Sequence, residues 1–221
     1  MIVLALETAT AACSVALWRD GGVAARRFAA LGRGHAEALV PMIAEVLAEA
    51  GVAAADADRI AVTVGPGAFT GLRVGLATAR GLALATGRPV VGVTTFDAVA
   101  HGLPPMARPL LVAVDSRRRE LFLQRYDAAR RPDGEPVLLD PDACAAWLPP
   151  GPLTVAGDGA AALSAVLAGR ADTLFADGPG LPDAAVVARL AAGLAPGGGL
   201  PPRPLYLRAP DAIPARREPA S

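Results

Sequence analysis

The sequence predicts an α/β protein of two tandem lobes, in which mixed β-sheets are flanked by helices. Short apolar runs of strand length alternate with longer segments of helical periodicity through roughly the first hundred residues. The arrangement then restarts, because residues 2–6 and 110–114 are both apolar runs and each ends in an acid, Glu7 or Asp115. These observations predict a duplicated unit rather than one continuous sheet.

Each element of the first half has its own signal. Residues 2–6 are continuously apolar, which is typical of a buried strand. The turn Asp20-Gly21-Gly22 predicts a hairpin between the next two strands, and Pro41 predicts an irregular first turn in the first helix. The expected elements are strands at 2–6, 13–18 and 23–28, a helix at 36–50, a strand at 60–64, a helix at 70–86 and a strand at 90–93. This order gives a meander followed by two crossovers, which should be right-handed.

A Gly-Pro-Gly turn joins strand 60–64 to the second helix, where Thr70 is the expected N-cap. The positive end of a helix dipole behind such a loop could hold an anion. The loop is not a phosphate-binding P-loop, because no Gly-Lys-Ser/Thr follows it. The spacing of its glycines does not fit the dinucleotide-binding fingerprint either.

The second helix carries a stripe of small residues, Gly71, Gly75 and Ala79, spaced four residues apart. Glycines inside a helix cost roughly 1 kcal/mol each relative to alanine, so close packing against another backbone is expected to offset this. Arg73 and Arg80 lie nearly opposite the stripe. Two interpretations stay open: the stripe or its leucine-bearing flank contacts another chain, or the segment is an ordinary core helix of an alanine-rich protein.

The second half repeats the layout more weakly. Its expected elements are strands at 110–114, 121–126 and 154–156, a helix after Gly157-Asp158-Gly159, a helix at 183–194 and a docked strand at Leu205-Tyr206-Leu207. Two tandem copies of a ribonuclease-H-like unit would explain this layout. Clustered prolines near the middle of the chain place the boundary, so the predicted domains are 1–103, 104–209 and a loose tail at 210–221.

Composition excludes several classes of function. The chain has 221 residues, 53% of them hydrophobic, and a formal net charge of zero, so no global field attracts nucleic acid or anionic membrane. All 21 basic residues are arginine, which removes lysine-dependent Schiff-base and phosphate-loop chemistry. The isolated cysteines Cys13 and Cys144, and the lack of a membrane-length apolar run, favour a soluble, cytoplasmic protein.

The chain carries a series of short motifs: Glu7-Thr8-Ala9-Thr10, Cys13-Ser14-Val15-Ala16-Leu17, His35, Gly65-Pro66-Gly67-Ala68-Phe69-Thr70-Gly71-Leu72-Arg73, Gly92-Val93-Thr94-Thr95, Asp115-Ser116-Arg117 with Glu120, and Tyr206-Leu207-Arg208. In this order they resemble the bacterial TsaB (YeaZ) family. The resemblance covers nearly the whole chain and is strongest through residue 126. The chain departs from the family at Glu7, where aspartate is usual, and after Arg208, where Ala209-Pro210-Asp211 replaces a basic segment.

The resemblance implies an actin/Hsp70/sugar-kinase-like fold of two ribonuclease-H-like lobes. It also implies a non-catalytic role in forming N6-threonylcarbamoyladenosine at position 37 of tRNAs that read ANN codons. In that role the protein is a partner of the TsaD subunit, in an assembly that also uses TsaE. No cofactor is expected. Because the net charge is zero, affinity for free tRNA should be weak, and tRNA is expected to contact the chain only through the assembly.

The expected partner surface lies on the two helices of the first lobe, against TsaD or against a second copy of the chain in a homodimer. Its candidate residues are His35, Leu39, Ile43, Val46, Gly71, Leu72, Gly75, Leu76 and Ala79. Candidate anion or nucleotide contacts are Glu7, Thr8, Thr10, Gly67, Thr70, Arg73, Asp115 and Arg117. The arginine turn at 117–119 is either a solvated hairpin or a phosphate contact.

Other classes of function remain as alternatives. No metal site is expected, because no histidine lies four residues after His35. His35 itself is expected at a helix start or on the surface, with an interface or ligand role as the alternative. An ATPase or phosphotransferase acting alone would use Glu7 and Asp115, facing each other across a cleft between the lobes. A peptidase is disfavoured, because Ser14 and Thr8 have no evident base. A self-assembling, chaperone-like module is a further class.

Overall fold

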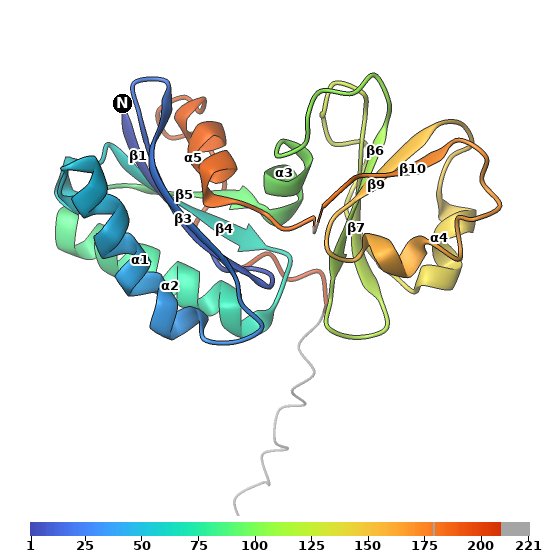
Figure 1. Ribbon diagram of the computed structural model, residues 1–221, viewed down its shortest axis with the longest axis horizontal. Helices are drawn as coiled ribbons and strands as arrows, with labels where there is room; N and C mark the ends of the chain where they lie inside the picture. Colours follow the sequence, from blue (N-terminus) through green and yellow to red (C-terminus); the bar gives the residue numbers. More distant parts are fainter. Residues whose placement is uncertain (179, 209–221) are drawn as a thin grey trace, which may run out of the picture.

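The structure, a computed structural model, describes residues 1–178 and 180–208 and contains two mixed five-stranded sheets, one in each half of the chain (Figure 1). The first consists, in spatial order, of β3 (Gly22–Ala30), β2 (Ala12–Arg19), β1 (Ile2–Glu7), β4 (Arg59–Gly65) and β5 (Val90–Thr94). The second consists of β10 (Thr173–Phe175), β9 (Leu153–Ala156), β6 (Leu110–Asp115), β7 (Leu121–Tyr126) and β8 (Val137–Leu139). In each sheet the strand that comes first in the chain, β1 or β6, pairs antiparallel with the strand that follows it in the chain and parallel with a later one. The predicted duplicated α/β fold is confirmed.

Helices α1 (His35–Ala50) and α2 (Phe69–Thr86) cover one face of the first sheet, and α5 (Ala184–Ala192) covers the other (Figure 1). Successive residues of β1 point to opposite faces. Leu4 and Leu6 therefore pack in the core under α1 and α2, while Val3 and Ala5 pack against α5. A strand buried on both faces needs apolar side chains throughout, which explains the unbroken apolar run of β1.

Helix α3 (Thr95–Ala100) joins the lobes. It follows β5 of the first sheet, yet Phe96 and Val99 pack in one cluster with Val112 and Val114 of β6 in the second sheet. The opposite face of the second sheet is covered by α4 (Pro141–Trp147) and by a short 3₁₀ helix, η2 (Ala160–Leu163). A further 3₁₀ helix, η1 (Ala54–Asp56), precedes β4. None of α3, α4, β8 and β10 was predicted from the sequence.

The second predicted domain, 104–209, does not pack as one unit. Helix α5 lies within it along the chain, but Val187 and Ala188 pack in the core of the first sheet. Leu205 likewise docks on the first lobe, where its N–H donates to the Val64 carbonyl oxygen at 2.7 Å. This segment docks as expected but forms no strand. The tail at 210–221 lies outside the described residues.

Two helices differ from their predictions. Only η2 follows Gly157-Asp158-Gly159, because hydrogen bonds there join residues three apart, such as the Ala162 N–H to the Gly159 carbonyl oxygen at 3.2 Å. Helix α1 is continuous from His35 to Ala50 despite Pro41, so the irregular first turn expected from that proline is not observed.

Candidate functional site

Glu7 ends β1 and is fully buried. Its Oε1 accepts hydrogen bonds from the Ala9 backbone N–H at 2.6 Å and the Thr63 hydroxyl at 3.3 Å, while its Oε2 has no partner among the described residues. Burial raises the pKa of this carboxyl to about 8, and the charges of Asp158 and Asp183 act in the same direction. At neutral pH Glu7 is therefore mostly protonated, which makes it a poor ligand for a divalent cation.

Asp115 ends β6, the counterpart of β1 in the second sheet. Its Oδ1 accepts the Arg117 backbone N–H at 2.7 Å, and the Arg117 guanidinium lies 3.3 Å from its Oδ2. The Asp115 N–H donates to Asp158 Oδ1 at 2.9 Å, and burial raises the pKa of Asp158. Within the described residues Glu7 and Asp115 share no hydrogen bond; Asp158 relates the two, because its charge acts on Glu7 and its Oδ1 accepts the Asp115 N–H.

The glycine loop between β4 and α2 packs against the segment that follows β1. A Cβ atom on Gly67 would lie 2.1 Å from the Ala9 carbonyl oxygen, and one on Gly71 would lie 2.1 Å from the Thr8 carbonyl oxygen. The Ala68 N–H donates to the Ala9 carbonyl oxygen at 2.7 Å, and the Thr8 hydroxyl donates to the Gly71 carbonyl oxygen at 2.7 Å. Close approach to this neighbouring backbone explains the glycines without an anion.

The start of α2 differs from its prediction. The helix begins at Phe69 with Ala68 as its N-cap, so the prediction that Thr70 is the cap is wrong. The Ala68 carbonyl oxygen accepts the Leu72 N–H at 2.9 Å, so Thr70 already lies inside the first helical turn. Thr70 and Arg73 are exposed, and the Arg73 guanidinium lies 3.6 Å from the centre of the Phe69 ring. Arg73 is thus held on the helix surface by a cation–π contact.

His35 and Thr10 connect α1 to the turn between β1 and β2. His35 is the first residue of α1, and its Nε2 lies 2.9 Å from the Thr10 carbonyl oxygen and 3.1 Å from the Ala12 carbonyl oxygen. Because both partners are acceptors, Nε2 carries the hydrogen. The Thr10 hydroxyl accepts the Ala12 N–H at 3.2 Å. This position agrees with the helix-start role expected for His35.

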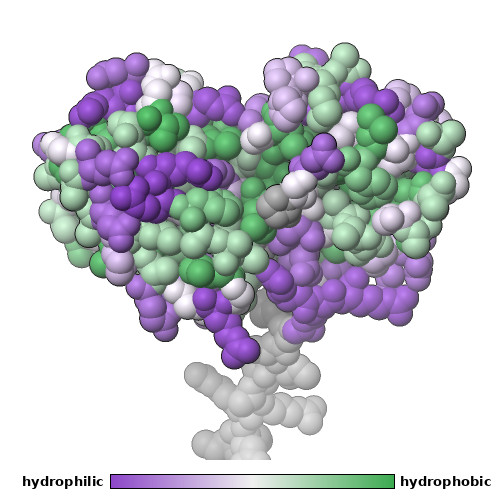
Figure 2. Space-filling view, viewed as in Figure 1, coloured by the Kyte–Doolittle hydropathy of each residue, from purple (hydrophilic) through white to green (hydrophobic). Residues whose placement is uncertain are grey.

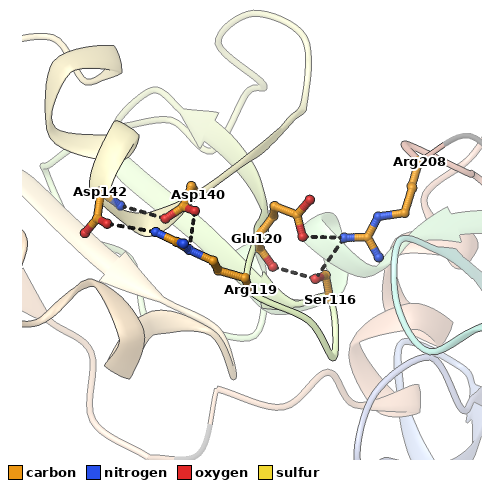
Figure 3. A network of polar contacts seen from close by, with 6 residues as sticks. All are labelled: Ser116, Arg119, Glu120, Asp140, Asp142 and Arg208. Carbon is orange, nitrogen blue, oxygen red and sulfur yellow. Dashed lines mark hydrogen bonds and ion pairs between the residues drawn. The ribbon is translucent and has the colours of Figure 1, made fainter.

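Figure 3 shows two motifs that are far apart in the sequence and meet at the turn between β6 and β7. Arg208 donates to Glu120 Oε2 at 2.9 Å and to the Ser116 hydroxyl at 3.4 Å. Ser116 in turn donates to the Glu120 carbonyl oxygen at 2.5 Å. On the other side of the turn, Arg119 pairs with the two aspartates at the start of α4. These contacts fix the turn and engage Arg119 within the chain.

Reactive groups in the described part of the chain have structural roles. Both cysteines, Cys13 and Cys144, are buried free thiols, and burial raises the pKa of each to about 11, which makes them weak nucleophiles. The Ser14 hydroxyl accepts the Ala184 N–H at 2.9 Å at the start of α5. Across residues 1–178 and 180–208, no group of three histidine, cysteine, aspartate or glutamate side chains is placed to hold a metal ion. In the same part of the chain, no helix has the length and apolar character needed to cross a membrane.

The interface residues predicted on α1 and α2 mostly lie inside the first lobe. The side chains that pack between the helices and the sheet are Leu39, Ile43, Val46, Leu72, Leu76 and Ala79. Gly71 and Gly75 face Thr8, and a Cβ on Gly75 would lie 2.4 Å from the Thr8 hydroxyl oxygen. The stripe therefore packs inside its own lobe, on the backbone of Thr8 at Gly71 and on the Thr8 side chain at Gly75, and these residues are covered in this structure.

The opposite, outer face of the two helices exposes apolar side chains among charged ones. Leu84 is 90% exposed, Val40 60% and Phe69 56%. In the view of Figure 2, hydrophobic surface lies around a central hydrophilic band over this helix pair. We call this surface the α1–α2 face; its members are Ala36, Val40, Pro41, Ala44 and Ala48 of α1 and Phe69, Ala77, Gly81 and Leu84 of α2.

Several charged side chains beside the α1–α2 face are engaged within the chain, while Glu37 and Arg73 are exposed. Arg27 lies 2.7 Å from Glu45 and 2.6 Å from Glu49, and Arg80 donates to the Pro202 carbonyl oxygen at 3.1 Å. A partner docking there would leave these charges paired, which avoids the penalty of burying an isolated charge.

Val40 and Phe69 of this face were not among the candidates from the sequence, whereas Ala77 and Leu84 belong to the leucine-bearing flank that was one of the two contacts left open. The signal for this flank is the helical wheel of α2, on which Leu84 and Ala77 lie opposite Gly75. A helix that is apolar on both sides is usually covered on both sides. For α2 the sequence left this second contact open between the small-residue stripe and the leucine-bearing flank, and the structure covers the stripe within the lobe.

Comparison with known proteins identifies the family. Residues 18–155, more than half of the chain, match the family described as TsaD: tRNA N6-adenosine threonylcarbamoyltransferase. The crystal structure of YeaZ from Pseudomonas aeruginosa is 32% identical and superposes with a TM-score of 0.80, over 93% of this chain and 99% of that chain. The chain belongs to the TsaB (YeaZ) family. The resemblance in the motifs is thereby confirmed, and the two lobes are those of the YeaZ structure.

Two relatives show how much of this TsaB family member can be aligned with known sequences. The Escherichia coli tRNA threonylcarbamoyladenosine biosynthesis protein TsaB is 41% identical over 128 residues, which are 57% of this chain and 55% of the E. coli protein. An uncharacterized protein of Mycobacterium tuberculosis is 40% identical over 158 residues, 70% of this chain and 71% of that protein. The chain thus spans about half the length of E. coli TsaB in this match.

Proposed function

We propose that this TsaB family member is a non-catalytic, cytoplasmic subunit of the assembly that forms N6-threonylcarbamoyladenosine at position 37 of ANN-decoding tRNAs. We propose that it binds the TsaD subunit through the α1–α2 face. The observation that carries the proposal is the exposure of Leu84, Val40 and Phe69 on the outer surface of one helix pair, beside which Arg27 is paired with Glu45 and Glu49. The similarity to the E. coli tRNA threonylcarbamoyladenosine biosynthesis protein TsaB and the match to the TsaD family support the same process.

TsaD is the favoured partner because the matched residues, 18–155, include α1 and α2. A relative with the same helix pair can pack face to face with this one in a pseudo-twofold arrangement. Ala44, Ala77 and Gly81 leave little side chain on the surface, so the helix backbones can approach closely. A homodimer through this same face is the competing state, which TsaD would displace. TsaE and tRNA would join the assembly after TsaD has bound.

A supporting role agrees with the state of the polar groups. Glu7 is mostly protonated at neutral pH, and Asp115 is paired with Arg117. Neither acid is then free to organise a metal nucleotide, as an ATPase acting alone would require. Under our proposal the purified chain does not hydrolyse ATP, and Asp115→Asn leaves tRNA modification by the assembly unchanged. ATP turnover by the chain alone that disappears in Asp115→Asn would favour the enzyme instead.

Leu84→Arg should weaken binding to TsaD by roughly 30-fold or more, because a guanidinium would enter an apolar contact, a penalty of about 2 kcal/mol. The thermal unfolding temperature of the Leu84→Arg variant alone should equal that of the unmodified chain, since Leu84 is 90% exposed in the isolated chain. Isothermal titration with purified TsaD measures the affinity. A tRNA-modification assay with TsaD and TsaE, with and without this chain, measures the function.

The matched control is Leu174→Arg, which introduces the same charge at a leucine that is 52% exposed on β10 of the other lobe. This variant should bind TsaD as the unmodified chain does. If Leu84→Arg and Leu174→Arg bind equally well, the α1–α2 face is not the contact. If modification proceeds equally well without the chain, the role in the assembly is excluded.

A further inference from the structure

A cavity lies away from the α1–α2 face, where the two lobes meet beside the end of α3. Its volume is about 520 Å³, which is within the usual range for small-molecule sites. Its walls come from the chain after α3, from α5 and from the turn after β7. The residues that matter here are His101, Leu103, Met106, Ala129, Arg130 and Arg189.

Arg130 is the unusual member of this cavity wall. It is only 9% exposed, and within the described part of the chain none of its three guanidinium nitrogens has a hydrogen-bond partner. A buried cation without a partner is strongly unfavourable, and such groups are rare in folded proteins. No aspartate or glutamate is among the described residues that line the cavity. The chain itself therefore supplies no counter-charge to Arg130 here.

The other polar side chains of the cavity do not supply an anion either. Arg189 donates to the His101 carbonyl oxygen at 2.6 Å. The pKa of His101 is lowered, first by burial and further by the charges of Arg189 and Arg130, while Asp97 acts in the opposite direction. Asp97 is already engaged, because it accepts the Tyr126 hydroxyl at 2.8 Å. Two arginines and a histidine thus share a small space.

We propose that this cavity binds a small organic oxyanion, a carboxylate or a phosphate monoester with an apolar body. The oxyanion supplies the missing counter-charge, and the planar guanidinium of Arg130 can pair with two of its oxygens at once. Leu103, Met106 and Ala129 offer an apolar wall to the rest of the molecule. Because α5 packs on the first sheet and the β7 turn belongs to the second, the ligand contacts both lobes. This site is separate from the α1–α2 face and does not depend on TsaD binding.

Titration calorimetry and thermal unfolding of the full chain test the proposal with phenyl phosphate, benzoate and the neutral benzyl alcohol. The oxyanion that fits should bind and raise Tm in proportion to its occupancy. Benzyl alcohol should bind about tenfold more weakly or not at all. Tighter binding of phenyl phosphate indicates a phosphate ligand, and tighter binding of benzoate indicates a carboxylate. Failure of both oxyanions to bind at millimolar concentration, or equal binding of benzyl alcohol, overturns the proposal.

Arg130→Met keeps the length of the side chain and removes its charge. It should weaken oxyanion binding by about tenfold or more, and the ligand-free variant should unfold at the same temperature as the unmodified chain or higher. Arg33→Gln, in the exposed loop before α1, removes one positive charge elsewhere and should bind normally. If Arg130→Met does not fold, Arg189→Gln serves in its place with the same expected weakening. Unchanged oxyanion affinity in the variant tested contradicts the proposal.

Discussion

Gly71→Ala should destabilise the protein by about 2 kcal/mol or more, although alanine normally stabilises a helix by about 1 kcal/mol relative to glycine. The new Cβ would lie 2.1 Å from the Thr8 carbonyl oxygen. That atom belongs to the backbone, so it cannot move aside as the end of a side chain could. The Thr8 hydroxyl also bonds the Gly71 carbonyl oxygen at 2.7 Å, and separating the two segments would lengthen this bond. Tm should fall by roughly 5 °C or more.

Gly81→Ala is the matched control in the same helix. Nothing lies within 4 Å of its new Cβ, so this variant should gain about 1 kcal/mol of stability and roughly 2–4 °C in Tm. Denaturant unfolding followed by circular dichroism measures both free energies. Shifts of the same sign in the two variants would contradict the assignment of the stripe to packing inside the lobe.

Gly75 provides a rescue test of the same packing. Its new Cβ would lie 2.4 Å from the hydroxyl oxygen of Thr8, which is a side-chain atom. Thr8→Ala should therefore relieve the destabilisation caused by Gly75→Ala. It should not relieve the destabilisation caused by Gly71→Ala, where the obstacle is a carbonyl oxygen that alanine retains.

The small-residue stripe of α2 shows which part of its packing could be predicted from the sequence. The spacing of Gly71, Gly75 and Ala79 correctly indicated a close approach between backbones. It could not say whose backbone, because the same pattern suits the lobe's own sheet and a partner helix equally. The segment that fills the space, Thr8 and Ala9, lies roughly sixty residues earlier in the chain. Contacts at such separation leave no local periodicity in the sequence.

Elements whose signal is local and long were predicted well. Apart from the six-residue α3, which was not predicted, the strands and α-helices at residues 1–103 agree with their predicted positions to within one or two residues. Each of them has an unbroken apolar run or a clear helical period. The short elements were missed: three-residue strands such as β8 and β10 contain too few side chains to show a period. The packing of α5 on the first sheet was missed for a different reason. Its apolar side identifies it as a covered helix but does not say which sheet covers it.

For the candidate sites too, local motifs were visible in the sequence, whereas contacts between distant segments were not. Motif residues Glu120 and Arg208 were noted separately, and only the folded chain shows that they bond to each other. The Arg130 cavity was not predicted at all, since it combines segments around residues 101, 130 and 189 that have no motif in common. Glu7 was identified from its place at the end of a strand, but its protonation depends on burial, which sequence does not give.

Stability should fall as pH rises from about 4.5 to about 8, because of Glu7. Its pKa rises from 4.5 to about 8 in the folded protein as a result of burial. Over that range the folded protein holds a proton that the unfolded chain has released, so stability decreases with increasing pH, by up to about 5 kcal/mol in all. Below this range both states are protonated, and above it both are charged, so the slope from this group vanishes.

Glu7→Gln keeps the shape of the neutral acid and cannot ionise, so it should remove this contribution. At pH 5 the variant should lie within about 1 kcal/mol of the unmodified chain, and at pH 8 it should be clearly more stable. Denaturant unfolding at several pH values gives the difference in unfolding free energy between the two proteins. In this difference the contributions of the other titratable groups, including Asp158, cancel to first order. Glu37→Gln, at an exposed position in the first turn of α1, controls for loss of one carboxylate. A constant difference between Glu7→Gln and the unmodified chain from pH 5 to pH 8 would mean that Glu7 is ionised throughout, and a charged group at this position would reopen the case for a nucleotide-binding site at the end of β1.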